Sequence, residues 1–382
     1  MTVQQTIVRH FTEQFSATPA LTVRAPGRVN LIGEHTDYNQ GFVLPCAIDF
    51  AAYIALAPNH SHQVRVYAAD YREHDVFSLD QAITPHPTQI WCNYVRGVIW
   101  ALAEHGFPLP AGIDLAITGN VPQGAGLSSS AALEVGVAKA IQEYFDLQLD
   151  AAQLAGIAQF AENRFVGCQC GIMDQLASAK GRRNHALLID CRNLHTEPIP
   201  LPEQLSVAII HSHVRRGLVD SEYNLRRAQC EAAARHFGVA SLRDLTWANF
   251  EAGKQGLDDT VARRARYIIG ENQRTLDAAD ALRHGDTAAL GCLMAQSHAG
   301  MRDEFNITHP AVDTLVELAD EVIGTQGGAR MTGGGFGGCV VALLPHEQVG
   351  ELKQHIAKHY HARSGLHEEI FVCTAQDGAA PI

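Results

Sequence analysis

A glycine- and serine-rich segment, residues 121–131 (VPQGAGLSSSA), carries the strongest chemical signal in the chain. It stands between a predicted strand and a predicted helix. Glycines let a backbone approach a ligand closely, and the free amides at a helix start favour an anion such as phosphate. A hydroxyl of Ser128, Ser129 or Ser130 could also ligate Mg²⁺. The alternative is an ordinary glycine turn with serine N-caps.

A second segment, residues 25–39 (APGRVNLIGEHTDYN), concentrates hydrogen-bonding side chains. Within eleven positions it holds Arg28, Glu34, His35, Asp37 and Tyr38. This density suits a polyhydroxylated ligand, because each sugar hydroxyl needs donors and acceptors. The apolar residues between them indicate partial burial, where polar groups must be paired. A solvated polar loop is the alternative.

A third segment, residues 167–175 (GCQCGIMDQ), follows a predicted helix that carries Glu162. Glu162 and Asp174 could serve one site as metal ligand and base. Cys168 and Cys170 form a C-x-C pair that supplies only two metal ligands, so we expect buried structural thiols instead.

A fourth segment, residues 330–339 (RMTGGGFGGC), holds five glycines in six residues just before a predicted strand. Such a run permits backbone dihedrals that are closed to other residues. It indicates either close approach to a ligand or a tightly packed turn. The sequence leaves both interpretations open.

The elements that must position these segments alternate between strands and helices. Apolar runs and period-2 alternation predict strands over residues 51–57, 64–68, 113–117, 185–190, 207–210 and 339–344. Helical spacing predicts helices over residues 131–145, 150–166, 172–179, 221–237 and 310–323. Since both halves mix the two kinds of element, we expect two α/β or α+β domains. The proline-containing region 192–204 is the predicted boundary.

Composition narrows the class of protein. The chain has 382 residues, enough for about two domains, and is 46% hydrophobic and 18% charged, as globular proteins are. A net charge of −12 disfavours sequence-independent binding of nucleic acid. Nine cysteines without a C-x-x-C pair indicate reduced thiols. Because we find no signal peptide and no apolar run that could span a bilayer, we expect a soluble cytoplasmic protein.

Together the four segments resemble the galactokinase family, part of the superfamily named after galactokinase, homoserine kinase, mevalonate kinase and phosphomevalonate kinase. Residues 27–38 are similar to the galactokinase-specific signature, residues 121–134 to the phosphate loop and residues 327–339 to the third superfamily motif. The resemblance implies an α+β (mixed α/β) fold of two domains. An S5-domain-2-like α/β domain would span residues 1–198 and a ferredoxin-like α+β domain residues 199–382, with the active site in the cleft between them.

The resemblance also implies roles for single residues. Asp174 would be the catalytic base, and Arg28 would stabilise the transition state. The sugar would contact Glu34, His35, Thr36, Asp37, Gly171 and Tyr223. ATP would contact Gly124, Ala125, Gly126, Leu127, Ser128, Ser129 and Ser130 through its phosphates, and Trp91 and Tyr94 through its adenine. Ser130 and Glu162 would hold Mg²⁺.

The implied reaction transfers the γ-phosphoryl group of MgATP to the C1 hydroxyl of α-D-galactose, the first step of galactose catabolism by the Leloir pathway. One alternative is an N-acetylgalactosamine kinase, because the motifs do not settle the pocket around C2. Another is a non-catalytic sensor of galactose and ATP, which the presence of residues 128–131, Glu162 and Asp174 disfavours. We expect a monomer with no nucleic-acid or membrane partner.

Overall fold

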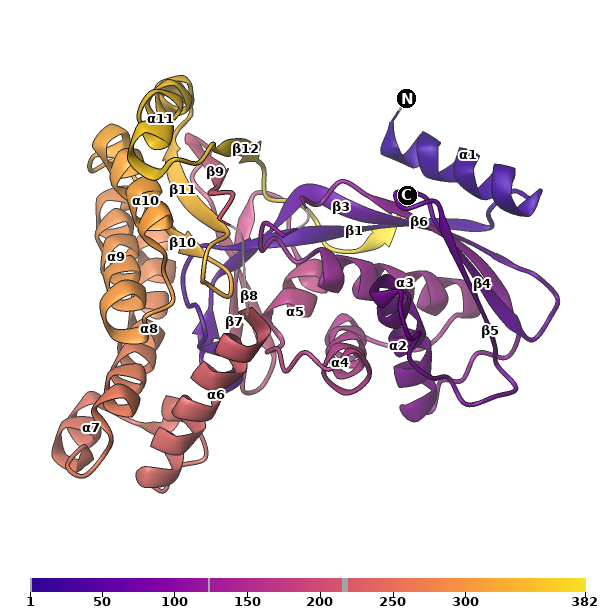
Figure 1. The fold of residues 1–382 in the computed structure, drawn as a ribbon, viewed down its shortest axis with the longest axis horizontal. Helices are drawn as coiled ribbons and strands as arrows, with labels where there is room; N and C mark the ends of the chain where they lie inside the picture. The colour runs from indigo at the N-terminus through magenta and orange to yellow at the C-terminus, as the bar shows by residue number, and fades with distance from the viewer. Residues whose placement is uncertain (1, 123, 215–218) are drawn as a thin grey trace.

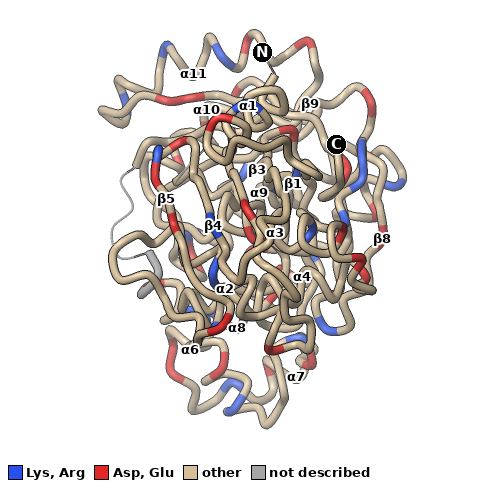
Figure 2. Tube along the Cα trace, turned by 90° about the vertical axis from the view of Figure 1, so that its right-hand side faces the viewer, with Lys and Arg blue, Asp and Glu red and all other residues tan. Residues whose placement is uncertain are grey.

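The structure is a computed structural model, and it describes residues 2–122, 124–214 and 219–382. It contains a six-stranded, a four-stranded and a three-stranded sheet. The six-stranded sheet and the four-stranded sheet lie toward opposite ends of the molecule, each covered by its own helices (Figure 1). Acidic and basic residues are interspersed along the whole trace (Figure 2).

The six-stranded sheet is built from the N-terminal half and the last residues of the chain. Its strands, in order across the sheet, are β13 (Ala380–Pro381), β1 (Leu21–Asn30), β3 (Pro45–Pro58), β6 (Ile113–Gly119), β4 (Gln63–Ala68) and β5 (Glu73–Ser78). Neighbours are antiparallel, except that β4 and β6 are parallel. One face carries α1 (Val3–Phe15). The other carries α2 (Ile90–Glu104), α3 (Ser129–Phe145), α4 (Ala151–Ala161) and α5 (Met173–Lys180) (Figure 1).

Alternation along β6 shows how this sheet is buried on both faces. Ile113, Leu115 and Ile117 enter the core shared with α2, α3 and α4. Ala116, on the opposite face, packs in the cluster that holds Ile7 and Phe11 of α1. Because successive strand residues point to opposite faces, the period-2 pattern read from the sequence predicted this strand correctly.

The four-stranded sheet is antiparallel throughout, in the order β10 (Gly328–Thr332), β11 (Cys339–Pro345), β9 (Leu205–His211) and β12 (Glu369–Cys373). The helices of this half are α6 (Val219–His236), α7 (Trp247–Gly253), α8 (Asp259–His284), α9 (Thr287–Gly300), α10 (Pro310–Ile323) and α11 (Val349–Ser364). The small third sheet consists of β2 (Phe42–Val43), β7 (His185–Asp190) and β8 (His195–Pro200).

The two halves share a continuous hydrophobic core. Ala208 and Ile210 of β9 pack in a cluster with residues of the C-terminal helices. Val207 and Ile209, on the opposite face of the same strand, pack in a cluster that includes Val29 of β1. The four-stranded sheet is therefore buried between its own helices and the first half of the chain.

The predicted strands and helices correspond to β3, β4, β6, β7, β9 and β11 and to α3, α4, α5, α6 and α10. The predicted helix 150–166 changes its character at Glu162, where a π-helical turn, Glu162–Val166, follows α4. Strand β8 lies within the region 192–204, which the sequence predicted as the boundary between the domains. Its prolines are tolerated since β8 is an edge strand. The domain boundary at residue 198 stays a prediction. Among the described residues, every helix is too short or too polar to cross a bilayer.

Candidate active site

Arg28 and Asp174 come from different elements and are in direct contact. Arg28 lies on β1, and Asp174 lies in the first turn of α5. The Arg28 guanidinium donates two hydrogen bonds to the Asp174 carboxylate, from Nε to Oδ1 at 2.7 Å and from Nη2 to Oδ2 at 2.6 Å. Nη1 donates to the carbonyl of Gly126 at 2.7 Å, and the Ser128 hydroxyl donates to Asp174 Oδ2 at 2.5 Å. The catalytic pair predicted from the resemblance is thus in direct contact with the predicted phosphate loop.

Gly27 explains how the loop can lie directly against β1. A Cβ at this position would stand 2.6 Å from the carbonyl oxygen of Leu127, so only glycine leaves room for the contact. The register of β1 and β3 shifts between Pro26 and Arg28, and the Arg28 amide then donates to Leu127 at 3.1 Å. Ala125 and Leu127 anchor the other side of the loop, because their side chains are buried in the core.

A polar cavity of about 150 Å³ adjoins the Arg28–Asp174 pair. Its lining includes eight residues that the sequence assigned to the sugar, the metal or catalysis: Arg28, Glu34, His35, Asp37, Glu162, Gly171, Asp174 and Tyr223. It also includes Cys168, Cys170, Met173, Gly333 and Gly334, which the sequence did not assign to a ligand. Segments far apart in the sequence therefore converge on one cavity, which we call the sugar-side cavity.

Two expectations about this region need correction. Thr36 is fully buried, and its hydroxyl lies 2.8 Å from the carbonyl of Gly33 and 2.5 Å from that of Phe42, so it closes a turn and does not line the sugar-side cavity. Cys168 and Cys170 are not buried structural thiols. Both are partly exposed and line the cavity, because the turn that carries them faces it.

Burial sets the protonation of the groups around the sugar-side cavity. It raises the pKa of Asp37 to about 6, with a further contribution from the nearby charge of Asp174. Burial also raises the pKa of Glu34, although Arg330 opposes the shift. The pKa of His35 falls to about 3, chiefly through burial, so its imidazole is neutral at pH 7. Its Nδ1 lies 2.8 Å from the Tyr38 hydroxyl, and its ring packs on that of Tyr223.

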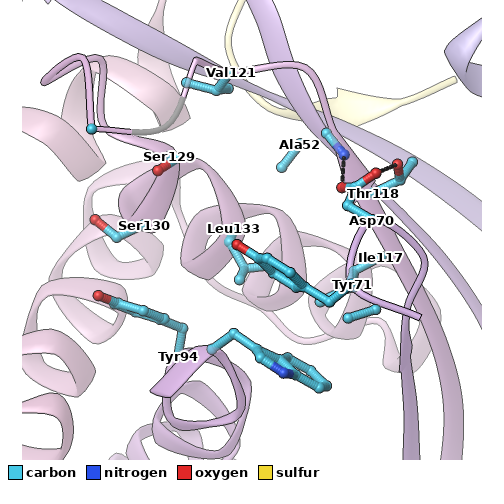
Figure 3. A pocket seen from close by; sticks show the side chains of 14 residues that line it. Ala52, Asp70, Tyr71, Tyr94, Ile117, Thr118, Val121, Ser129, Ser130 and Leu133 are labelled. Atoms are coloured by element: carbon cyan, nitrogen blue, oxygen red, sulfur yellow. Dashed lines mark hydrogen bonds between the residues drawn. The ribbon is translucent and has the colours of Figure 1, made fainter. Parts of the chain in front are cut away.

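A second cavity, of about 290 Å³, lies on the other side of the predicted phosphate loop and is lined by fewer charged side chains. Its lining includes Trp91, Tyr94, Gly124, Ser129 and Ser130, which the resemblance had assigned to ATP. Figure 3 shows Tyr71 and Tyr94 extending into the same space as Ser129 and Ser130.

The sequence did not single out Asp70 and Tyr71, which follow β4 and complete the wall of this cavity. Asp70 is held by the Thr118 hydroxyl at 2.7 Å and by the Gly119 amide at 2.9 Å (Figure 3). Trp91 is fixed from outside, because its indole nitrogen donates to Glu73 at 2.5 Å. An aromatic wall of this kind suits a flat heterocycle.

The start of α3 separates the two cavities. Ser128 is the N-cap residue, with a left-handed φ of 59°, yet its side chain makes no capping hydrogen bond. Its hydroxyl is turned instead to Asp174. The interpretation of this segment as a turn with an ordinary serine N-cap is therefore wrong at Ser128. Amides at a helix start that lack a side-chain cap suit a phosphate group.

The residues predicted to hold Mg²⁺ are suited to it. Ser130 donates a hydrogen bond to Glu162, so a hydroxyl and a carboxylate, both oxygen donors, lie together beside the phosphate loop. Glu134 is fully buried next to Glu162, and its Oε1 has no hydrogen-bond partner among the described residues. Burial raises the pKa of both carboxyl groups, and either protonation of one of them or a bound cation such as Mg²⁺ would stabilise the pair.

Comparison with known proteins identifies the family to which this chain belongs. The galactokinase galactose-binding signature matches residues 9–58, and the GHMP kinase models match residues 93–182 with the N-terminal domain and 278–362 with the C-terminal domain. A galactokinase from Lactococcus lactis, solved in complex with galactose, is 32% identical, with 100% of each chain covered and a TM-score of 0.96. The chain belongs to the galactokinase family. This membership confirms the two-domain, mixed α/β fold expected of a galactokinase.

More distant structures share the galactokinase fold alone. Mevalonate kinase from Methanococcus jannaschii is 18% identical, with 94% of this chain and 98% of that chain covered and a TM-score of 0.65. Homoserine kinase from Cytophaga hutchinsonii is 19% identical, with 95% of this chain and 97% of that chain covered and a TM-score of 0.61. Phosphoryl transfer from ATP is the chemistry that the superfamily's name implies.

Proposed function

We propose that this chain is an ATP-dependent galactokinase that forms α-D-galactose 1-phosphate and ADP. The observation that carries the proposal is the position of the Arg28–Asp174 pair. It lies between a small polar cavity and a helix start suited to phosphate, in a chain of the galactokinase family. A hydroxyl acceptor on one side and a phosphoryl donor on the other would meet there.

Asp174 is the residue best placed to receive the C1 hydroxyl of galactose. Its carboxylate offers about four lone-pair sites. Arg28 and Ser128 use one on Oδ1 and two on Oδ2, which leaves one on Oδ1 for the substrate. Phosphoryl transfer passes through a loose transition state that needs little activation of the nucleophile. Asp174 therefore orients the hydroxyl and accepts its proton late in the reaction.

Arg28 has two tasks in this proposal. Its two parallel hydrogen bonds fix the orientation of the Asp174 carboxylate. Its positive charge stabilises the negative charge of the phosphoryl group in the transition state. The amides at the start of α3 would bind the phosphates of ATP, and Trp91 and Tyr94 would flank its adenine. Ser130 and Glu162 would hold Mg²⁺, which neutralises phosphate charge when bound.

The sugar hydroxyls would be recognised by Glu34, His35, Asp37, Gly171 and Tyr223, which line the sugar-side cavity. The two carboxylates are acceptors, and neutral His35 can donate or accept through the ring nitrogen not paired with Tyr38. Rigid packing supports specificity here. A Cβ on Gly171 would stand 1.9 Å from Asp37 Oδ2, so the glycine backbone holds this carboxylate in place.

A coupled assay of ADP release with a panel of sugars tests the function. We expect turnover with galactose, and weaker or no turnover with N-acetylgalactosamine, glucose and arabinose. Preference for N-acetylgalactosamine would instead identify the kinase of that sugar. Binding of galactose and ATP without turnover of any sugar would identify a sensor. A cytoplasmic, monomeric state remains our prediction, and light scattering after size exclusion tests the monomer.

A further inference from the structure

The third glycine motif has no role in the proposed reaction so far, although Gly333 and Gly334 line the sugar-side cavity. Gly333, Gly335, Gly337 and Gly338 all have positive φ, between 84° and 122°. The run thus reverses the chain tightly between β10 and β11. The residues at its start, Arg330 to Gly333, turn toward the first half of the chain.

Three contacts from this motif end on one carboxylate, that of Glu34. Arg330 Nη2 donates to Glu34 Oε2 at 2.7 Å, and the Gly333 amide donates to Oε1 at 2.7 Å. The Thr332 hydroxyl lies 3.2 Å from Oε1. Arg330 and Thr332 are fully buried, and Glu34 is 2% exposed. The motif is therefore built around a side chain that faces the sugar-side cavity.

Arg330 also fixes the backbone that precedes Glu34. Its Nη1 donates to the carbonyl of Leu31 at 3.1 Å and lies 3.4 Å from that of Asn30. The Asn30 side-chain amide in turn donates to Glu34 Oε2. One planar guanidinium thus holds both the carboxylate and the strand end that carries it, which a lysine ammonium cannot do in the same geometry.

Counting lone pairs leaves one site on Glu34 for a ligand. Oε2 accepts from Asn30 and Arg330, and Oε1 accepts from Gly333. Thr332 has a single hydroxyl proton, and its shorter contact is to the Asn30 carbonyl at 2.9 Å, so this proton is used there. A carboxylate offers about four lone-pair sites. The remaining one lies on Oε1, available to a sugar hydroxyl.

We propose that Arg330 is a positioning residue for Glu34, and that through it the third glycine motif serves recognition of galactose. The inference rests on the proposed contact between Glu34 and the sugar. It makes the sugar site a joint product of both halves, since Glu34 comes from the first and Arg330 from the second. The change expected on disturbing Arg330 is weaker galactose binding, with ATP binding preserved.

Arg330→Lys tests the positioning role of Arg330. Lysine keeps the buried positive charge beside Glu34 but cannot form the guanidinium contacts to both the Glu34 carboxylate and the Leu31 carbonyl. Calorimetry should show galactose binding weakened about tenfold, and kinetics should show a raised KM for galactose with little change in kcat or in KM for ATP. Arg243→Lys is the matched control. Arg243 forms a fork with Asp190 at 3.1 Å, it also links the two halves, and it lies outside the sugar-side cavity.

Glu34→Gln separates failure of this inference from failure of the sugar assignment. If Glu34→Gln weakens galactose binding and Arg330→Lys does not, the positioning role is overturned and the sugar contact stands. If neither variant changes galactose affinity, both are overturned. An equal rise in KM for ATP and for galactose in Arg330→Lys would also overturn the inference. Should Arg330→Lys fold poorly, the same measurements on Thr332→Val, which releases the Asn30 carbonyl without removing charge, replace it.

Discussion

Asp174 is proposed to act mainly by orienting the acceptor hydroxyl. It is held on both oxygens, by Arg28 and by Ser128. In this position it would place the sugar hydroxyl oxygen in line with the phosphoryl group, and in a loose transition state such positioning supplies most of the rate acceleration.

Replacing Asp174 with asparagine separates the two tasks of this residue. Asparagine retains an oxygen that can accept the hydroxyl but cannot take its proton. We expect turnover to fall by more than about 10³-fold, roughly the upper range for general-base catalysis, while galactose binding survives in part. Single-turnover kinetics and calorimetry on one preparation give both quantities, and a kcat near that of the wild type would refute the assignment.

Replacing Arg28 with lysine tests the need for a guanidinium fork. Lysine keeps the charge but makes only one contact where arginine makes two to Asp174 and one to Gly126. We expect kcat to fall by about 10²-fold, with a smaller change in the affinity for galactose. Arg65→Lys is a suitable control, since Arg65 forms a comparable fork with Asp114 on the far side of the sheet. An active Arg28→Lys variant would contradict the role proposed for the fork.

The raised pKa of Asp37, about 6, predicts a specific pH dependence. The ionised carboxylate accepts hydrogen bonds from sugar hydroxyls more strongly and at more positions than the protonated group does, so galactose affinity should be constant above pH 7 and decrease as pH falls through 6. Below that value a slope of about tenfold per pH unit corresponds to one proton. Galactose binding measured from pH 5 to 8 checks this. In Asp37→Asn the overall affinity should be lower and this dependence should disappear; a persisting slope would assign it to another group.

At the scale of elements, the turn before α5 positions two ligand residues at once. Gly171 packs on Asp37, and Asp174 follows in the first turn of the helix. We expect Gly171→Ala to weaken galactose binding about tenfold or more, because the new Cβ would displace the Asp37 carboxylate. Gly156→Ala, in the middle of α4 with open space around it, is the control. It should leave binding intact and stabilise the protein by about 0.5–1 kcal/mol. Equal binding in both variants would contradict the packing argument.

Sequence patterns predicted the elements with a regular period but not all those that carry the site. Strand β6 and helix α10 were predicted because their apolar residues recur at fixed intervals. The segment 25–39 was interpreted as a possible polar loop, whereas its first part belongs to β1, which pairs with β3 in the six-stranded sheet. Its proline, glycine and arginine conceal the strand, because the strand is shaped by contact with the phosphate loop, and local propensity does not encode that contact.

The proposed nucleotide site shows a second limit of the sequence. Glycine spacing and a predicted helix start were enough to predict a phosphate loop, because those features are local. Asp70 and Tyr71 reach the same cavity from the end of β4, through pairing with β6 that joins distant segments. Nothing in their immediate sequence marks them. Arg330 was missed for the same reason, because its partner Glu34 lies nearly 300 positions earlier.

At the scale of the whole molecule, residues 378–382 form hydrogen bonds with both elements that carry the proposed catalytic pair. The Gly378 and Ala379 amides donate to Gly181 and Ser178 at the end of α5, and Ile382 donates to Thr22 of β1. These elements carry Asp174 and Arg28. The C-terminal residues therefore connect β1 with the end of α5.

Removing residues 378–382 should therefore destabilise the protein and impair catalysis together. At about 0.5–1.5 kcal/mol for each of the three hydrogen bonds named above, we expect a loss of about 2–4 kcal/mol in the free energy of unfolding. Urea denaturation measures this, and kcat at a temperature where the variant is folded measures the second effect. Removing residues 2–5, the N-cap and the first residues of α1, is the control for kcat, because these residues lie apart from both cavities. A truncated protein with unchanged stability and kcat would contradict the role of the tail.

The pairing of β13 with β1 is also among the most non-local contacts of the fold. Val23 and Arg24 of β1 pair with Pro381 and Ala380, which lie more than 350 positions later in the sequence. Because contacts of such sequence separation form slowly, we expect this edge of the six-stranded sheet to close late during refolding.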